Sequence, residues 1–273
     1  MNFSSGRQNS KAEVLQSDEK IRLAKAALYI AQEEYPQLPV HKYLNLLDKM
    51  AGVVLEELPA ERYPLRIIKA INHYLYKSLG FQGNSQDYYD PCNSFLNNVL
   101  ERRKGIPITL SLVYLEIAHR IDFPMVGIGM PGHFLIRPNF EDAGIFVDAF
   151  NQGEILFEQD CQEKLNQLYK QEVPLEERFF APVTNRQFLQ RMLTNLKHIY
   201  LSHNQLIRAL TVVERILLLV PDAPQEIRDR GIIYYQLGEL PRANDDLKKY
   251  LDIAPQAEDL ALIVQLIEQI NQS

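Results

Sequence analysis

Cysteine is scarce in this chain, with two residues in 273. Cys92 and Cys161 lie far apart and lack the spacing of a metal site, and the histidines show no ligand spacing either. This use of cysteine is typical of a protein in a reducing compartment. We therefore expect a cytoplasmic protein without a metal centre.

Long apolar runs and concentrated positive charge are also missing. No apolar run approaches the ~20 residues that a membrane-spanning helix needs. The formal charge is -6, and the longest basic run, Arg102–Lys104, is typical of a solvated helix end. Neither a membrane nor a nucleic acid is therefore an expected partner. The sequence contains no phosphate loop, nucleotide fingerprint or cofactor motif, so we expect no cofactor.

The N-terminal part reads as a series of helices in a soluble globular protein, with 46% hydrophobic and 23% charged residues. Residues 1–16 lack the apolar core of a secretory signal and are expected to form a disordered or frayed tail. A capping serine and two acids at Ser17–Glu19 precede the first helix pattern, which ends before Pro36. A second helix is predicted over 40–57 and a third after Pro64.

The middle of the chain changes to a helix-then-strand order. Asn93 is placed to cap a helix that ends near Gly105, and Pro107 suits the first turn of the next helix. That next helix, ITLSLVYLEIAHRI, is apolar on most of its circumference and is predicted to be central and buried. Short β-like runs follow, namely MVGIGM, HFLIR, GIFVD and EILF. This order predicts an α+β fold with a small antiparallel sheet.

The C-terminal part repeats itself with a period of 34 residues. The matching pairs include Leu206 with Leu240, Ala209 with Ala243 and Pro221 with Pro255. Such a period indicates a duplicated helical hairpin, and the second copy has small and aromatic residues at the offsets of a tetratricopeptide repeat. A last helix, from about residue 258 to residue 269, is expected to cap the stack.

Residues 88–156 resemble a known family. The stretches NSFLNNVLERRKGIP, GHFLIR and VDAFNQG are similar to signature blocks of a divergent bacterial transglutaminase-like domain, the SirB family, whose members carry C-terminal tetratricopeptide-like repeats. The resemblance implies a helix-rich, papain-like core within 17–182. Two α-helical tetratricopeptide-type repeats with a capping helix would occupy 183–273. The segment 174–182, PLEERFFAP, marks the boundary, and its two phenylalanines are expected to keep the two parts docked.

The resemblance places a cysteine-type catalytic triad in this block, with one member missing. It puts the triad histidine at His133 and the triad acid at Asp148, while the cysteine position falls on Pro107. In such an enzyme the imidazole takes the proton of a thiol at a helix N-terminus, and the carboxylate orients the imidazole. Proline offers no nucleophile. His133 and Asp148 also lack a third nearby ligand, so no zinc site is expected.

Other residues of these blocks have two interpretations each. Cys92, just before a predicted helix start, is either a relocated nucleophile near His133 or a small packing residue. Five further residues either frame a polar binding pocket around His133 or serve as caps and surface ion pairs. They are Asn93, Glu101, Arg102, Arg103 and Asn151.

Three functions remain open. The first is a non-catalytic transglutaminase-like scaffold that binds a protein or peptide partner. The second is a hydrolase or acyl transferase of altered mechanism, in which His133 and Asp148 act with Cys92 or with water. The third is an interaction protein in which the repeats do all the binding. The first is preferred, because the thiol is missing while helical repeats present a groove suited to peptides. The sequence does not determine the oligomeric state.

Overall fold

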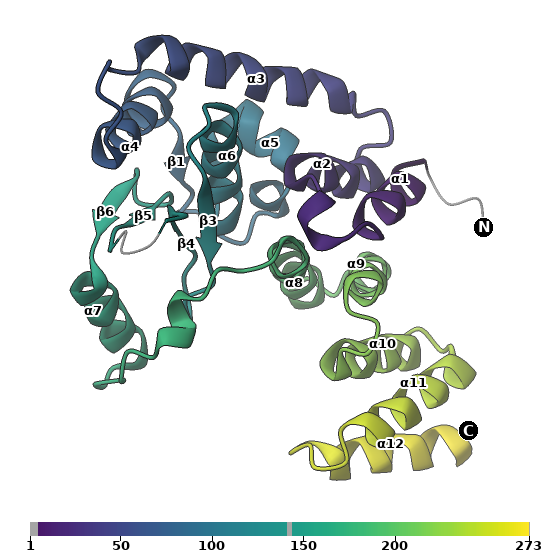
Figure 1. Cartoon of the computed structure of the whole chain (residues 1–273). Helices are drawn as coiled ribbons and strands as arrows, with labels where there is room; N and C mark the ends of the chain where they lie inside the picture. Colours follow the sequence, from purple (N-terminus) through teal and green to yellow (C-terminus); the bar gives the residue numbers. More distant parts are fainter. Residues whose placement is uncertain (1–4, 141–143, 273) are drawn as a thin grey trace. The chain divides into compact units, whose positions relative to one another are not determined.

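The computed structural model describes residues 5–140 and 144–272, which are mostly helical. The chain divides into two compact units, Met1–Leu189 and Gln190–Ser273. Figure 1 shows the helices and strands coloured along the sequence. In the described part of the chain, no helix has both the length and the apolar character needed to cross a membrane.

Three helices near the start of the first unit lie where the sequence pattern predicted them. A 3₁₀ turn at Asp18–Lys20 precedes α2, which spans Leu23–Glu34. Helix α3 spans Val40–Glu57, and α4 spans Pro64–Asn72 with proline in its first turn. A π-helical segment, His73–Ser78, continues α4.

The N-terminal segment differs from the predicted frayed tail, since Ser5–Val14 forms helix α1. Val14 is buried there. The Glu13 carboxylate, 3% exposed, lies 3.2 Å from Lys25 and accepts hydrogen bonds from Arg22. These contacts tie α1 to α2. The partners that order this helix lie outside it, and its own sequence shows little periodicity, so sequence reasoning missed it.

The signature block forms a short turn and a helix. A 3₁₀ turn at Pro91–Ser94 precedes α5, which spans Leu96–Arg102. The predicted cap was wrong, because Phe95 occupies the N-cap position of α5 and Asn93 lies in the preceding turn. The helix ends at Arg103, whose φ of 57° is left-handed and stops further helical hydrogen bonding.

Helix α6, Pro107–Arg120, is the central helix of the first unit. Pro107 occupies its first turn, as predicted, because that position needs no backbone donor. Nearly every residue of α6 is buried, including Thr109 and Ser111. Helices α3 and α5 and strand β3 (Met125–Ile128) pack against it. The apolar circumference read from the sequence is therefore enclosed on several sides.

Four strands follow and form one antiparallel sheet in the order β3-β4-β5-β6. After β3 come β4 at Leu135–Pro138, β5 at Phe146–Asp148 and β6 at Glu154–Leu156. Each strand matches one predicted β-like run, and the α+β class is confirmed. A separate parallel pair, β1 (Gln82–Gly83) with β2 (Lys104–Gly105), was not predicted, because two-residue strands leave no periodic pattern.

Helix α7, Glu158–Tyr169, and a 3₁₀ turn at Glu177–Phe180 complete this region. Phe179 and Phe180 pack against a core formed by the sheet and α7. The Phe180 ring lies 4.8 Å from the ring of Phe146 in β5. The two phenylalanines of the predicted linker therefore pack against the core of the first unit, and their role in docking the two parts stays a prediction.

The second unit consists of helical hairpins with the predicted 34-residue spacing. The helices are α8 (Asn185–Ser202), whose first residues belong to the first unit, and then α9 (Leu206–Leu219), α10 (Pro224–Gln236), α11 (Leu240–Ile253) and α12 (Leu260–Gln272). Gly231 of α10 faces Leu247 of α11, where a Cβ would come within 2.8 Å of the leucine Cγ. The glycine thus permits the close approach expected of a tetratricopeptide-type pair. The boundary between the units, after Leu189, falls inside α8 and not at residue 182.

Candidate functional site

His133 and Asp148 meet across two neighbouring strands. His133 follows the turn before β4, and Asp148 is the last residue of β5. The strands are antiparallel, with Ile136 opposite Val147, so the two side chains emerge near each other. His133 Nε2 lies 2.8 Å from Asp148 Oδ2. The structure therefore contains the histidine–carboxylate dyad that the resemblance implied.

The Asp148 carboxylate is fully enclosed and well satisfied. It is 0% exposed, whereas the His133 side chain is 19% exposed. Its Oδ1 accepts the backbone N–H groups of Phe150 and Asn151 at 3.1 and 3.2 Å. Its Oδ2 also accepts the Asn151 side-chain amide at 2.8 Å, and Lys164 Nζ lies 3.5 Å away. This network holds an ionised carboxylate inside the protein.

Burial and this network together determine the direction in which the pKa values of Asp148, Lys164 and Tyr76 are shifted. Burial alone would raise the pKa of Asp148, but hydrogen bonds and charge from His133, with bonds from Asn151, lower the pKa overall. Burial opposes the charge of Lys164, yet Asp148 and Glu154 raise its pKa. Burial, followed by the Asp148 charge, raises the pKa of Tyr76, which stays protonated and donates to the Ala149 carbonyl at 3.0 Å.

Two glycines shape the turns that carry the dyad. Gly132 precedes His133 with a φ of +70°, and a Cβ there would lie 2.3 Å from Leu168 of α7. Gly153 follows β5 with a φ of +73°, and its carbonyl accepts the side-chain amide of Asn72 at 2.7 Å. Both turns need left-handed backbone without a side chain, which favours glycine. Helix α7 thus supports the dyad from Lys164 and braces the histidine turn through Leu168.

The N-terminus of α6, where the family pattern places a thiol, carries the buried Pro107. The preceding Ile106 N–H donates to Thr109 Oγ1 at 3.1 Å. The Thr109 hydroxyl in turn donates to the Asn93 carbonyl at 2.7 Å. The start of the helix is therefore closed by a buried hydrogen-bond chain, and the position of the family's thiol carries a proline ring without a nucleophilic group.

Phe150 links the dyad with the strands next to this helix start. Its ring lies edge-on to His133, with centroids 6.4 Å apart, and edge-on to Tyr88 at 6.1 Å. The same ring lies over Gly83, where a Cβ would meet it at 2.7 Å. Gly83 pairs with Gly105, two residues before Pro107. Aromatic carbon thus lies along the path between the imidazole and the helix start.

Cys92 does not have the surroundings of an activated thiol. Its Sγ lies 4.0 Å from the Tyr35 hydroxyl, and its backbone N–H donates to Asp90 Oδ1 at 2.9 Å. Burial raises the pKa of the Cys92 thiol, and the Asp90 carboxylate raises it further. Burial raises the pKa of Cys161 to about 12. A nucleophilic cysteine needs the opposite shift, towards thiolate at neutral pH.

The five predicted pocket residues separate into different surroundings. Asn151 joins the dyad. Asn93 is buried, accepts from Asn84 at 3.0 Å and donates to the Asp87 carbonyl at 2.7 Å, so it orders the loop before α5. The other three lie on or after α5 and make contacts apart from the dyad. Glu101 accepts from Tyr43 and Lys42, Arg102 pairs with Asp90, and Arg103 donates to the Leu79 carbonyl.

Sequence reasoning missed two contributors to the site, Lys164 and Phe150. Phe150 lies within the VDAFNQG block, two residues after Asp148, so its closeness to the dyad was open to inference. Lys164 comes from α7, and no pattern in the sequence around it indicates that it lies near Asp148. Among residues 5–140 and 144–272, no group of three or more His, Cys, Asp or Glu side chains is arranged to hold a metal ion.

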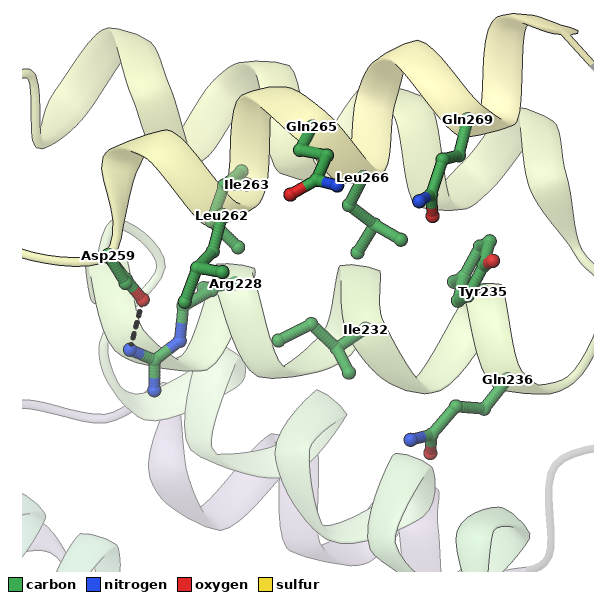
Figure 2. A pocket seen from close by; sticks show the side chains of 10 residues that line it. All are labelled: Arg228, Ile232, Tyr235, Gln236, Asp259, Leu262, Ile263, Gln265, Leu266 and Gln269. Carbon is green, nitrogen blue, oxygen red and sulfur yellow. Dashed lines mark hydrogen bonds and ion pairs between the residues drawn. The ribbon is translucent and has the colours of Figure 1, made fainter.

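A second candidate site is a groove of about 460 Å³ between α10 and α12 in the second unit. Figure 2 shows its lining side chains projecting from the two helices towards each other. Arg228 and Asp259 form an ion pair at one end, and Tyr235, Gln236 and Gln269 lie towards the other. Aliphatic side chains lie between them.

Comparison with known proteins agrees with this architecture. A family model described as "Transglutaminase-like superfamily" matches residues 41–194, and a "Tetratricopeptide repeat" model matches residues 196–268. The chain is 38% identical over 260 residues to a UPF0162 protein of Xylella fastidiosa (strain 9a5c). The aligned residues cover 93% of this chain and 91% of that protein. The chain belongs to the UPF0162 family. The predicted transglutaminase-like domain followed by tetratricopeptide-type repeats is confirmed.

Similar proteins also occur in another bacterium and in a mammal. A UPF0162 protein of Vibrio cholerae is 34% identical over 188 residues, or 68% of this chain and 69% of that protein. F-box only protein 21 of Mus musculus is 28% identical over 288 residues, which cover 92% of this chain but 45% of that protein. The UPF0162 architecture is therefore similar to a region within a longer mammalian protein.

Proposed function

We propose that this UPF0162 protein is a non-catalytic transglutaminase-like scaffold that binds a peptide segment of a protein partner. One observation carries the first half of the proposal. The helix N-terminus that would hold the nucleophile carries a buried proline, Pro107. Next to it, the Ile106 N–H bonds to the Thr109 hydroxyl, which bonds to the Asn93 carbonyl. Thiol acyl transfer needs a nucleophile beside the imidazole, and this position supplies none.

The persistence of the dyad has a structural explanation. Asp148 is fully buried and is held by His133, Asn151 and the backbone N–H of Phe150. Removing one partner of a buried charge leaves an unsatisfied carboxylate, which is expensive in stability. A histidine–aspartate pair is therefore useful to the fold even without a thiol.

The binding half of the proposal is supported by the second unit. Tetratricopeptide-type hairpins stack so that helices line a surface open to an extended chain. The groove between α10 and α12 is such a surface and contains both aliphatic and polar side chains. Binding energy would come from this groove, while the transglutaminase-like unit serves as the scaffold.

A second candidate is a hydrolase that uses water as the nucleophile. The observation that favours it is the partial exposure of His133, 19%, next to a buried carboxylate that orients the ring. An imidazole held in this way can act as a general base towards water. No thiol is needed for that reaction.

The test has a catalytic arm and a binding arm. In the first, the full chain and its His133→Ala variant are incubated with p-nitrophenyl acetate, and with a glutamine-containing peptide plus a fluorescent primary amine. Equal background rates are expected, and turnover that depends on His133 would favour the hydrolase or acyl transferase. In the second, a display library of random twelve-residue peptides is selected on the full chain. Failure to enrich any peptide would overturn the binding function.

A further inference from the structure

The groove between α10 and α12 has a shape that suits an extended peptide. Its lining positions on α10 run from Arg228 through Ile232 to Gln236, and those on α12 run from Leu262 through Leu266 to Gln269. A helix rises about 1.5 Å per residue, so the eight steps from Arg228 to Gln236 along α10 span roughly 12 Å. An extended chain advances about 3.3 Å per residue, so the groove matches roughly four peptide residues.

The charges at one end of the groove are already paired within the protein. Arg228 donates to Asp229 at 2.9 Å and to Asp259 at 2.8 Å. Asp259 also accepts the Tyr250 hydroxyl at 2.6 Å. Asp229 is shared with Lys197, whose ammonium group lies 2.7 Å away. The guanidinium is thus engaged on two sides and is poorly placed to bind the carboxylate of a partner.

This charged cluster carries an excess of negative charge. Lys197, 5% exposed, also lies 2.8 Å from Glu226. Two cations, Lys197 and Arg228, therefore face three carboxylates, on Glu226, Asp229 and Asp259. An acidic side chain or a free C-terminal carboxylate entering this end would meet repulsion. Acidic partners are therefore disfavoured. A basic side chain would gain little, because the carboxylates of Glu226, Asp229 and Asp259 are already bonded to Lys197, Arg228 or Tyr250.

The remaining polar groups of the groove are neutral. Gln236, Gln265 and Gln269 supply side-chain amides, and Tyr235 supplies a hydroxyl. An amide side chain both donates and accepts, so it complements the alternating N–H and C=O groups of an extended backbone. Amide groups recognise a peptide backbone without requiring charge on its side chains.

The apolar lining supplies the contacts that remove water. Ile232 of α10 and Leu262 and Leu266 of α12 face the groove between its polar ends, as Figure 2 shows. Leu262 is 68% exposed, so its side chain is accessible to a partner. Covering these side chains with an aliphatic residue of a partner would give the non-directional part of the binding energy.

We infer that the groove binds an uncharged, extended peptide segment of about four residues, with aliphatic side chains over Ile232, Leu262 and Leu266 and its backbone bonded by glutamine amides. The inference rests on the proposed function and specifies the class of partner. It excludes acidic tails and free C-termini as preferred ligands, because the cation in the groove is already neutralised.

The experiment uses the same library of random twelve-residue peptides on the full chain. Two enriched peptides are synthesised with a fluorescein label and a C-terminal amide, and Kd is measured by anisotropy. The variants are Leu262→Glu and Gln265→Ala in the groove. Ile207→Glu is the matched control, because Ile207 of α9 is 65% exposed and does not line the groove. Circular dichroism shows that each variant is folded.

The expected result is enrichment of uncharged, aliphatic motifs. Leu262→Glu should weaken binding about tenfold or more, Gln265→Ala about threefold, and Ile207→Glu less than about twofold. Raising NaCl from about 50 to about 500 mM should change Kd less than about twofold, because no ion pair forms. Enrichment of acidic, basic or free C-terminal motifs, or binding that is unchanged by Leu262→Glu, would overturn the inference and leave the binding function standing. No enrichment at all would overturn both.

Discussion

Asp148 shows how the fold itself can hold a histidine–carboxylate pair in place. Its carboxylate has no exposure to solvent and is held by a ring nitrogen, a side-chain amide and two backbone N–H groups. Each bond compensates the cost of burying a charge. The pair with His133 is therefore maintained by the free energy of folding, whatever its present chemistry.

Replacing this carboxylate should destabilise the protein in a pH-dependent way. Asp148→Asn is expected to lower the free energy of unfolding by about 2–4 kcal/mol at pH 7, because charge-assisted bonds become neutral or mismatched. The folded-state pKa of Asp148 is lowered, so its contribution is complete above the unfolded-state value near pH 4 and disappears as the pH falls through the folded-state value. Urea unfolding at pH 7, 5 and 3 measures this.

The control for that measurement is Asp87→Asn, since Asp87 is exposed. The difference in free energy of unfolding between wild type and Asp148→Asn should become smaller at pH 3. The control should stay within about 0.5 kcal/mol of wild type at all three pH values. A gap of constant size at all three pH values would show that the ionised carboxylate is not the stabilising form.

Cys92 should behave as an unactivated thiol. Its pKa is raised by burial and by Asp90, so alkylation by iodoacetamide at pH 7 should be slower than for free cysteine and should rise about tenfold per pH unit. Asp90→Asn removes the neighbouring charge and should accelerate alkylation, whereas His133→Ala should leave it unchanged. Peptide-level mass spectrometry gives the rates. Slower alkylation in His133→Ala would support a Cys92–His133 couple.

At the scale of elements, glycines decide where helices and turns can pack. Gly231 allows α10 to lie against Leu247 of α11. The predicted small-residue position is therefore explained by contact between two helices. The close contacts of Gly132 with Leu168 and of Gly153 with Asn72 could not be seen in the sequence, because the contacting residues come from other elements.

Adding a methyl group at this helix crossing should destabilise the second unit. Gly231→Ala gains about 0.5–1 kcal/mol of helix propensity but forces a Cβ to within 2.8 Å of Leu247 Cγ, and overpacking costs about 1–3 kcal/mol. We expect a net loss of about 1 kcal/mol, measured by thermal unfolding. In a Leu247→Ala background the same change should be neutral or stabilising. A destabilisation of equal size in both backgrounds would contradict the packing explanation.

At the scale of the whole molecule, the unit boundary lies inside a helix. The linker composition suggested a boundary after residue 182, but Phe188 of α8 is buried and its ring lies 5.0 Å from Phe134 of the first unit. The backbone N–H of Asn185 also donates to the Asp18 carboxylate at 2.9 Å. The start of α8 therefore completes the core of the first unit.

Fragments of the chain test this boundary. A fragment of residues 1–182 should be markedly less stable than one of residues 1–202, because it lacks the aromatic contact and the Asn185 bonds. In the full chain, Phe188→Ala should cost about 3–5 kcal/mol, as expected for a buried aromatic side chain. Circular dichroism with temperature compares the fragments. Equal midpoints would place the boundary before α8.

The sequence by itself determined the order of elements, the central apolar helix, the alternating strands and the 34-residue repeat, because each is a periodic pattern within a continuous segment. It also identified His133 and Asp148 through their signature blocks. Only the tertiary structure decided the helix at residues 5–14, the separation of Glu101 and the arginines from the dyad, and the support from Lys164. These depend on contacts between distant segments, which a local pattern does not encode.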